Sequence, residues 1–260
     1  MLLKEVIAEL EALSPPDFAE KWDNSGLMCG REKKEINKIL LAVDATDEVV
    51  EEAILSEADL LLTHHPLIFP TISSVTEKDI VGRRLLKLIQ ADVCCYAMHT
   101  NFDVIGMADE AADKLNLSDR KVLDVLYEDT LSQEGIGRVG LLPREISLRE
   151  CAELVKEVFL LDDVRVFGDL DKRIRKAAIS PGSGKKMSKH ALKAGAEVLI
   201  TGDIDHHEGI DSVAAGLCVI DAGHYGIEKI FVDYMKDFIL RNMPNITVIR
   251  ASQKTPFVVI

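Results

Sequence analysis

Six residues with metal-ligating side chains follow apolar segments that are typical of buried strands. They are His64, His65, His99, Asp103, His224 and Glu228. The chain has only 7 histidines, and four of them follow such segments, so histidine is concentrated at these positions. Neutral imidazoles mixed with carboxylates suit Zn, Fe, Mn, Co or Ni rather than Ca or Mg. The pattern therefore favours a metal site with open positions, and the alternative is a chance grouping of surface residues.

The spacing of these residues suggests how they are arranged. His64 and His65 are adjacent, so at a strand end we expect them to point to opposite sides and to bind two different ions. His99 and Asp103 are four residues apart, as are His224 and Glu228. A spacing of four brings two side chains to one face if the segment is helical.

Three further segments carry polar or unusual residues. Thr201–Glu208 contains Asp203 and His207, which could support the ligands or transfer protons, or could simply begin the next helix. Ser180–Lys186 contains Gly182 and Gly184 but lacks the P-loop spacing, so it is either a glycine turn or an anion-binding loop. Trp22–Gly26, with the only tryptophan, is expected to form a capped turn packed on the core.

Buried strands alternating with amphipathic helices would position these residues. Strands are expected at 38–43, 59–63, 93–98, 176–180 and 197–201, and helices at 2–13, 47–56, 79–90 and 187–194. We expect Asp47 to cap its helix. This alternation predicts an α/β protein with mainly parallel sheets flanked by helices, and ligands in such sheets bind at the carboxyl ends of the strands.

The second half of the chain repeats the pattern of the first. A shift of 138 residues places Lys38 on Lys176 and Thr63 on Thr201, and a shift of 125 places His99 on His224. Internal duplication therefore predicts two similar α/β domains. We expect residues 1–127 to carry His64, His65 and Asp103, and residues 128–260 to carry His224 and Glu228. The polar stretch 128–137 would connect them, and the segment from about residue 220 would pack back on the first domain.

Composition excludes several classes of protein. The 44 acidic and 31 basic residues give a formal charge of −13, which argues against binding to nucleic acid. No apolar run approaches the roughly 20 residues of a membrane span, and the N-terminal residues lack the apolar core of a signal peptide, so a cytoplasmic location without membrane contact is expected. The five cysteines are unpatterned and are expected to be reduced and buried.

Taken in order, these motifs resemble the NIF-three-like family of dinuclear metal-centre proteins, whose bacterial and archaeal members are often labelled GTP cyclohydrolase I type 2 homologues. The segments that carry the resemblance are 22–27, 62–67, 97–103, 201–207 and 221–228. The resemblance implies two similar α/β domains and a toroidal homohexamer. It also implies two divalent metal ions per subunit (Zn, Fe, Mn or Ni) with ligands at His64, His65, Asp103, His224 and Glu228. His99 belongs to the family motif but is kept apart from this ligand set, and the adjacent His206 and His207 depart from the single histidine common in the family.

Two functions fit this resemblance. The first is a metal-dependent hydrolase of a nucleotide or small heterocycle, similar to GTP cyclohydrolase type 2, with Asp203 or His207 moving protons. The second is a metal-handling or regulatory interaction protein, similar to a metallochaperone, that binds the same ions without turnover.

Overall fold

The computed structural model describes residues 1–130 and 132–260, which form two compact units. The first unit consists of Met1–Phe102 and Phe231–Lys254. The second consists of Asp103–Ile230 and Thr255–Ile260. The units are thus divided at residues 102 and 230, whereas the sequence suggested a division after residue 127.

The first unit is built on a sheet of order β1-β4-β3-β2-β11. The strands are β1 (Gly26–Cys29), β2 (Lys38–Ala42), β3 (Leu60–Thr63), β4 (Cys94–Ala97) and β11 (Thr247–Arg250). Strands β11, β2, β3 and β4 are parallel, and only β1 is antiparallel to its neighbour. The carboxyl ends of the parallel strands therefore lie at one edge, as expected.

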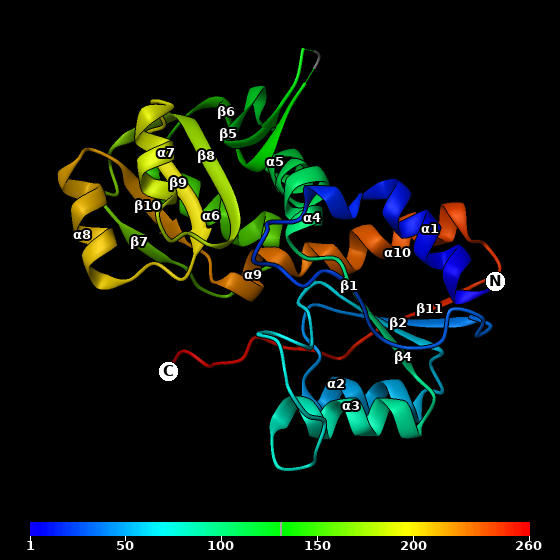
Figure 1. The fold of residues 1–260 in the computed structure, drawn as a ribbon. Coiled ribbons are helices and arrows are strands. Elements are labelled where there is room, and N and C mark those ends of the chain that lie inside the picture. The colour runs from blue at the N-terminus through cyan, green and yellow to red at the C-terminus, as the bar shows by residue number, and fades with distance from the viewer. Residues whose placement is uncertain (131) are drawn as a thin grey trace. The chain divides into compact units, whose positions relative to one another are not determined.

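Helices cover both faces of this sheet. Helices α2 (Asp47–Leu55) and α3 (Ile80–Gln90) lie on one face, and α1 (Leu3–Leu13) and α10 (Ile230–Asn242) lie on the other (Figure 1). Alternate strand residues such as Leu40 and Leu61 join the apolar core under α2 and α3. A strand buried on both faces must be apolar at every position, which explains the uninterrupted Leu60-Leu61-Leu62 run. Between β4 and the second unit lies α4 (Thr100–Phe102), and Pro16–Phe18 is a 3₁₀ turn.

The second unit contains a mixed sheet of order β5-β6-β8-β9-β10-β7. The strands are β5 (Ser118–Glu128), β6 (Gln133–Ser147), β7 (Arg165–Phe167), β8 (Arg173–Ser183), β9 (Val198–Gly202) and β10 (Cys218–Asp221). Strands β8, β9 and β10 are parallel, whereas β5, β6 and β7 are antiparallel to their neighbours. The helical segments are the π-helical turn η2 (Asp103–Met107), α5 (Ala108–Lys114), α6 (Leu148–Phe159), α7 (Met187–Lys193), α8 (His206–Ala214) and α9 (His224–Glu228).

The segment 128–137 does not connect two domains. Glu128 is the last residue of β5 and 133–137 are the first residues of β6, and these strands pair antiparallel with Glu128 opposite Gln133, so both ends of the segment belong to one sheet of the second unit. Residue 131 in this segment lies outside the described residues.

The two units repeat one βαβαβ core in detail. Ile39 pairs with Leu60 in the first unit, and Ala177 pairs with Val198 in the second, so the register follows the 138-residue shift. Glycines shifted by the same interval also have matching surroundings. A Cβ on Gly30 would lie 2.8 Å from Cys94 Sγ, and one on Gly168 would lie 2.7 Å from Cys218 Sγ. Such equivalent contacts support internal duplication.

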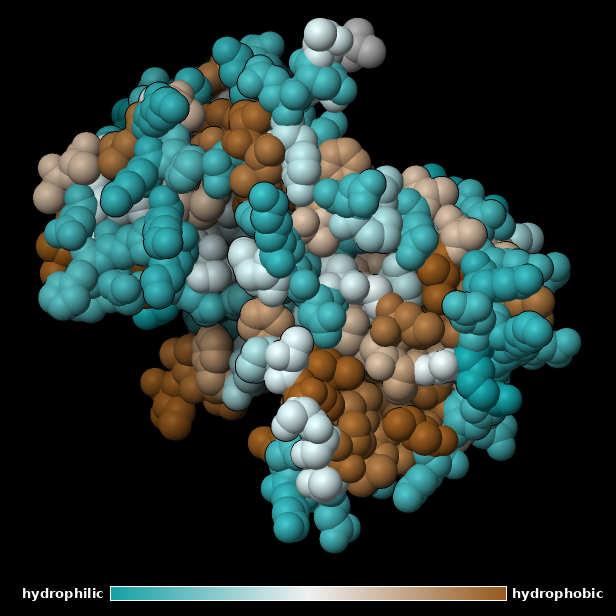
Figure 2. Space-filling view, viewed as in Figure 1, coloured by the Kyte–Doolittle hydropathy of each residue, from teal (hydrophilic) through white to brown (hydrophobic). Residues whose placement is uncertain are grey.

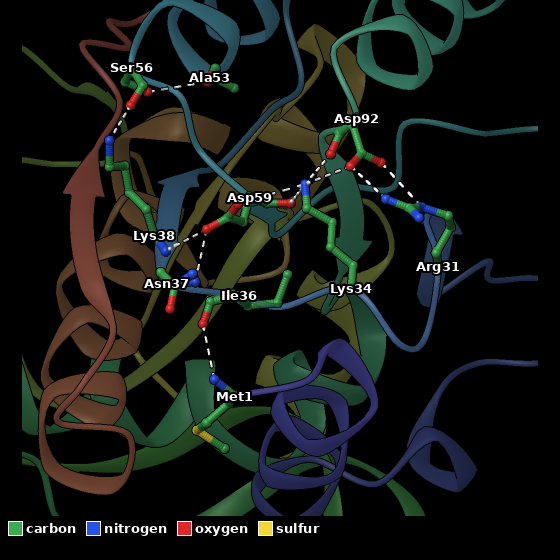
Figure 3. A network of polar contacts seen from close by, with 10 residues as sticks. All are labelled: Met1, Arg31, Lys34, Ile36, Asn37, Lys38, Ala53, Ser56, Asp59 and Asp92. Atoms are coloured by element: carbon green, nitrogen blue, oxygen red, sulfur yellow. Dashed lines mark hydrogen bonds and ion pairs between the residues drawn. The ribbon is translucent and has the colours of Figure 1, made fainter.

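A polar network at the start of these strands is also repeated. Asp59 accepts the backbone N–H groups of Asn37 and Lys38, as Figure 3 shows. Glu197 in the same way accepts those of Arg175 and Lys176. The Lys38 ammonium donates to the carbonyl of Ser56 at 2.6 Å (Figure 3), and Lys176 donates to that of Ala194 at 2.5 Å. Among the described residues, no helix is both long and apolar enough to cross a membrane.

Candidate metal centre

The carboxyl ends of β3 and β4 carry three histidines in the first unit. His64 and His65 directly follow β3, and their backbone N–H groups continue the ladder to Ala42 and Val43 of the β2 end. Strand β4 ends at Ala97, and His99 is the second residue after it. His64 is fully buried, and His65 and His99 are partly exposed.

These three imidazoles form one group. The ring centroids lie 4.8 Å apart for His64 and His65, 5.3 Å for His64 and His99, and 5.4 Å for His65 and His99. One ring nitrogen from each lies within 4.8 Å of the other two. The expectation that His64 and His65 point to opposite sides is therefore wrong. His99, which was kept apart from the ligand set implied by the family resemblance, belongs to the same group.

The Nδ1 atom of each of the three rings is held by an oxygen. His64 Nδ1 donates to the carbonyl of Met98 at 2.8 Å, because a carbonyl can only accept. His65 Nδ1 lies 2.7 Å from Asp44 Oδ1, and His99 Nδ1 lies 2.6 Å from Asp23 Oδ1. A neutral imidazole that donates through Nδ1 carries its lone pair on Nε2. Histidine ligands of metals are typically fixed in this way by a carboxylate or carbonyl.

Asp23 is itself firmly held. Its side chain is fully buried and accepts hydrogen bonds from the Ser25 hydroxyl and the Thr100 hydroxyl, both at 2.6 Å, in addition to His99. Burial alone raises the pKa of this carboxyl, but the hydrogen bonds from His99, Ser25 and Thr100 outweigh it and lower the pKa well below its usual range. Asp23 is therefore an ionised acceptor for His99.

Asp44 is anchored from the C-terminal part of the first unit. The Gln253 amide donates to Asp44 Oδ2 at 2.7 Å, and its oxygen accepts the backbone N–H groups of Val43 and Asp44. Gln253 thus fixes the carboxylate that orients His65.

In the second unit, α9 carries a histidine and a carboxylate side by side. His224 Nδ1 lies 2.7 Å from Asp203 Oδ2, and His224 Nε2 lies 3.1 Å from Glu228 Oε2. The four-residue spacing therefore does place His224 and Glu228 on one helix face. If Nδ1 donates to Asp203, Nε2 and the Glu228 oxygen both present lone pairs, and a proton or a cation is needed between them. Because Glu228 is only 3% exposed, the lone pairs of His224 Nε2 and of the Glu228 carboxylate suit a buried cation.

Gly182 makes room for the Glu228 carboxylate. Gly182 has φ +74°, and a Cβ at this position would lie 2.3 Å from Glu228 Oε1. The glycine segment 180–186 that the sequence singled out thus runs directly against the carboxylate, and only glycine allows this approach.

The remaining expected site residues lie in the second unit. Asp103 begins the π-helical turn η2 and is partly buried. Asp203, with φ +56°, lies between β9 and α8 and acts as the acceptor for His224. His207 lies exposed in the first turn of α8, with its ring 5.3 Å from that of His206.

Sequence reasoning identified Asp203, which holds His224, as a possible support of the ligands, but it missed Asp23 and Asp44, which hold His99 and His65. Asp44 ends an expected strand at the same edge as His65, which is a signal that could have identified it. Asp23 lies in the Trp22–Gly26 segment, whose expected role was packing on the core. The structure buries the Asp23 side chain but leaves Trp22 58% exposed, so that expectation is wrong for the tryptophan.

Comparisons with known proteins agree on one family. A protein of Clostridium perfringens named "GTP cyclohydrolase 1 type 2 homolog" is 39% identical over 230 residues, which cover 88% of this chain and 87% of that protein. A protein of Lactococcus lactis with the same name is 34% identical over 99% of both chains.

Solved structures give the same result. The fold matches the Staphylococcus aureus protein SA1388 with a TM-score of 0.89 and 28% identity, over 100% of this chain and 99% of that one. It matches reduced HcgD from Methanocaldococcus jannaschii with a TM-score of 0.84 and 31% identity, over 97% and 98% of the two chains. The family model Duf34/NIF3 (NGG1p interacting factor 3) matches residues 1–256, and the chain belongs to this family.

Proposed function

We propose that the protein binds two divalent metal ions per chain (Zn, Fe, Mn or Ni) and is a metal-dependent hydrolase of a nucleotide or small heterocycle. The proposed ligands are His64, His65, Asp103, His224 and Glu228. The observation that carries the proposal is the shared state of four imidazoles: His64, His65, His99 and His224 each have Nδ1 against an oxygen acceptor. In a ring fixed through Nδ1 in this way, Nε2 is the nitrogen that can bind a metal.

The protein's own groups would orient the ligands and move protons. Asp44 and Asp203 fix the rings of His65 and His224. A bound divalent ion would supply a water whose pKa is lowered towards neutrality. Asp203 and His207 are the candidate proton-transfer groups, and Asp203 has its second role as the partner of His224.

The names of the relatives support the choice of substrate class. The relatives from Clostridium perfringens and Lactococcus lactis are both named as homologues of a GTP cyclohydrolase, an enzyme that acts on a purine nucleotide. We therefore take GTP as the first substrate to test. Family membership also leads us to propose a toroidal homohexamer, and the formal charge of −13 leads us to propose that nucleic acid is not a partner. We also propose a cytoplasmic location without a membrane partner.

The proposal is tested by turnover of protein loaded in turn with Mn, Fe and Zn. Loaded protein should consume GTP or another member of a broad nucleotide panel. Asp203→Asn should lower the rate about 10- to 100-fold, because such outer partners of metal ligands typically contribute this much. Asp205→Asn is the matched control, since Asp205 lies on the same loop and caps α8 through the Glu208 N–H.

The same experiment separates the two functions. If fully loaded wild-type protein leaves GTP and the whole panel unchanged, the hydrolase proposal is wrong and the metal-handling function is preferred.

A further inference from the structure

Two aromatic side chains of the first unit are exposed side by side. Trp22 is 58% exposed and Phe69 is 50% exposed, and their ring centroids lie 6.0 Å apart at an interplanar angle of 73°. Hydrophobic residues also appear in patches on the surface drawn in Figure 2. Two features distinguish the Trp22–Phe69 pair. Hydrogen bonds anchor the segments that carry it, and it lies beside the ring of His99.

Hydrogen bonds fix both segments that carry the pair. The residue after Trp22 is Asp23, whose buried carboxylate accepts from His99, Ser25 and Thr100. The next residue, Asn24, donates its side-chain amide to the carbonyl of Ile68 at 2.7 Å. This bond joins the Trp22 segment to the residue that precedes Phe69. The two rings are therefore presented on an anchored backbone, so that little conformational entropy is lost when a ligand binds.

The pair lies next to the three-histidine group. The Trp22 ring lies 6.0 Å from the His99 ring at an angle of 74°. His99 in turn lies 5.3 Å from His64 and 5.4 Å from His65. A flat ring resting on Trp22 would thus lie one imidazole away from the candidate metal ligands.

We propose that Trp22 and Phe69 form an aromatic platform that binds a planar heterocycle, with a purine base as its substrate class. The steep angle between the two rings lets a base stack on one while it meets the edge of the other, the two arrangements that aromatic rings prefer. An exposed aromatic face held beside imidazoles suits a base better than an aliphatic ligand, because the base gains stacking energy. The inference rests on the proposed function and assigns it a substrate-binding site.

The single tryptophan makes the platform directly observable, because all indole fluorescence comes from Trp22. Guanosine 5′-monophosphate is titrated into the full-length protein, both metal-free and zinc-loaded, with ribose 5-phosphate as the ligand that lacks a base. The nucleotide should quench Trp22 fluorescence saturably, and the ribose phosphate should not. Phe69→Ala should weaken binding about 5-fold or more, as loss of a stacking ring typically does.

Control variants make the test independent of folding and of metal binding. Ile89→Ala removes an apolar side chain of the same unit that is 55% exposed on α3, and it should leave binding unchanged. Trp22→Leu, followed by equilibrium dialysis with the nucleotide, should weaken binding but leave the metal content unaltered.

Two results would overturn the platform. One is an absence of saturable quenching in both the metal-free and the zinc-loaded protein. The other is nucleotide affinity that is unchanged in both Phe69→Ala and Trp22→Leu. A protein that retains metal but does not bind the nucleotide refutes the platform alone. A protein that binds the nucleotide on Trp22 but retains no metal refutes the proposed metal function alone.

Discussion

The histidines of the candidate site are recognisable from residue type and spacing, but their partners from distant parts of the chain are not. His64, His65 and His224 follow apolar strands, so the sequence could point to them. The acceptor of His99 is Asp23, which is 76 residues away, and no local pattern connects them. The same applies to Gln253, which holds Asp44 from 209 residues further along the chain. Sequence patterns identify groups that can bind a metal, whereas the groups that orient them depend on tertiary packing.

Gly182→Ala should displace Glu228 and lower metal content. A Cβ at this position would lie 2.3 Å from Glu228 Oε1, and φ is +74°. Gly216→Ala is the matched control, because Gly216 has φ +93° but a Cβ there would meet nothing within 4 Å. Both variants should lose about 1–2 kcal/mol of unfolding free energy from the left-handed backbone. Only Gly182→Ala should lose metal in elemental analysis, and equal metal content in both would contradict this role.

The cysteine thiols should make stability fall at alkaline pH. All five cysteines are free. Burial, with a contribution from Cys94, raises the pKa of Cys29 to about 11, and burial, with one from Cys218, raises that of Cys151 to about 12. The unfolded chain then loses these protons first, so their stabilising contribution is complete below about pH 9 and is lost as pH rises towards 11 to 12. Urea unfolding at about pH 8 and pH 10 measures the loss.

Cys151→Ala serves as the control for this pH dependence. It removes one of the raised groups, so its unfolding free energy should fall less steeply between the two pH values than that of the wild type. Parallel falls in the two proteins would show that the Cys151 thiol does not contribute.

At the scale of elements, the short apolar strands and the helices between them could be predicted, and the long strands β5 and β6 could not. Strands β2, β3 and β4 are apolar at nearly every position, which makes them visible in the sequence. Helix α3 begins after Asp79, whose carboxylate accepts the Gly82 N–H at 2.7 Å. Helix α2 is instead capped by Thr46, with Asp47 in its first turn, so the expected cap was displaced by one residue. Strand β5 buries only Leu123, and its weak pattern led to the hairpin being interpreted as a connection.

The repeated carboxylates Asp59 and Glu197 should stabilise their units to a similar degree. Each accepts two backbone N–H groups at the start of a parallel strand. Replacement of either by alanine should lower the free energy of unfolding by about 1–3 kcal/mol, since these donors lose their acceptor. Glu51→Ala is the control, because it breaks only an exposed ion pair with Lys87, worth about 0–1 kcal/mol. Equal losses in chemical denaturation for all three variants would contradict the role of the network.

At the scale of the whole molecule, we expect a ring of six chains. This expectation comes from membership of the Duf34/NIF3 family and from no periodicity in the sequence. Sedimentation velocity at low micromolar concentration should show a hexamer. A monomer as the single species would refute the assembly without affecting the ligand set.

Counting metal ions per chain tests the central claim most directly. Protein prepared with excess Zn or Mn and then freed of unbound metal should hold about two ions per chain. Glu228→Gln should disturb both ions, because loss of the carboxylate charge leaves their mutual repulsion less screened. His64→Ala should lower the count, whereas His190→Ala should not, since His190 lies on α7 beside Asp124 rather than in the histidine group. A wild-type count of one ion or fewer that His64→Ala does not change would contradict the dinuclear account.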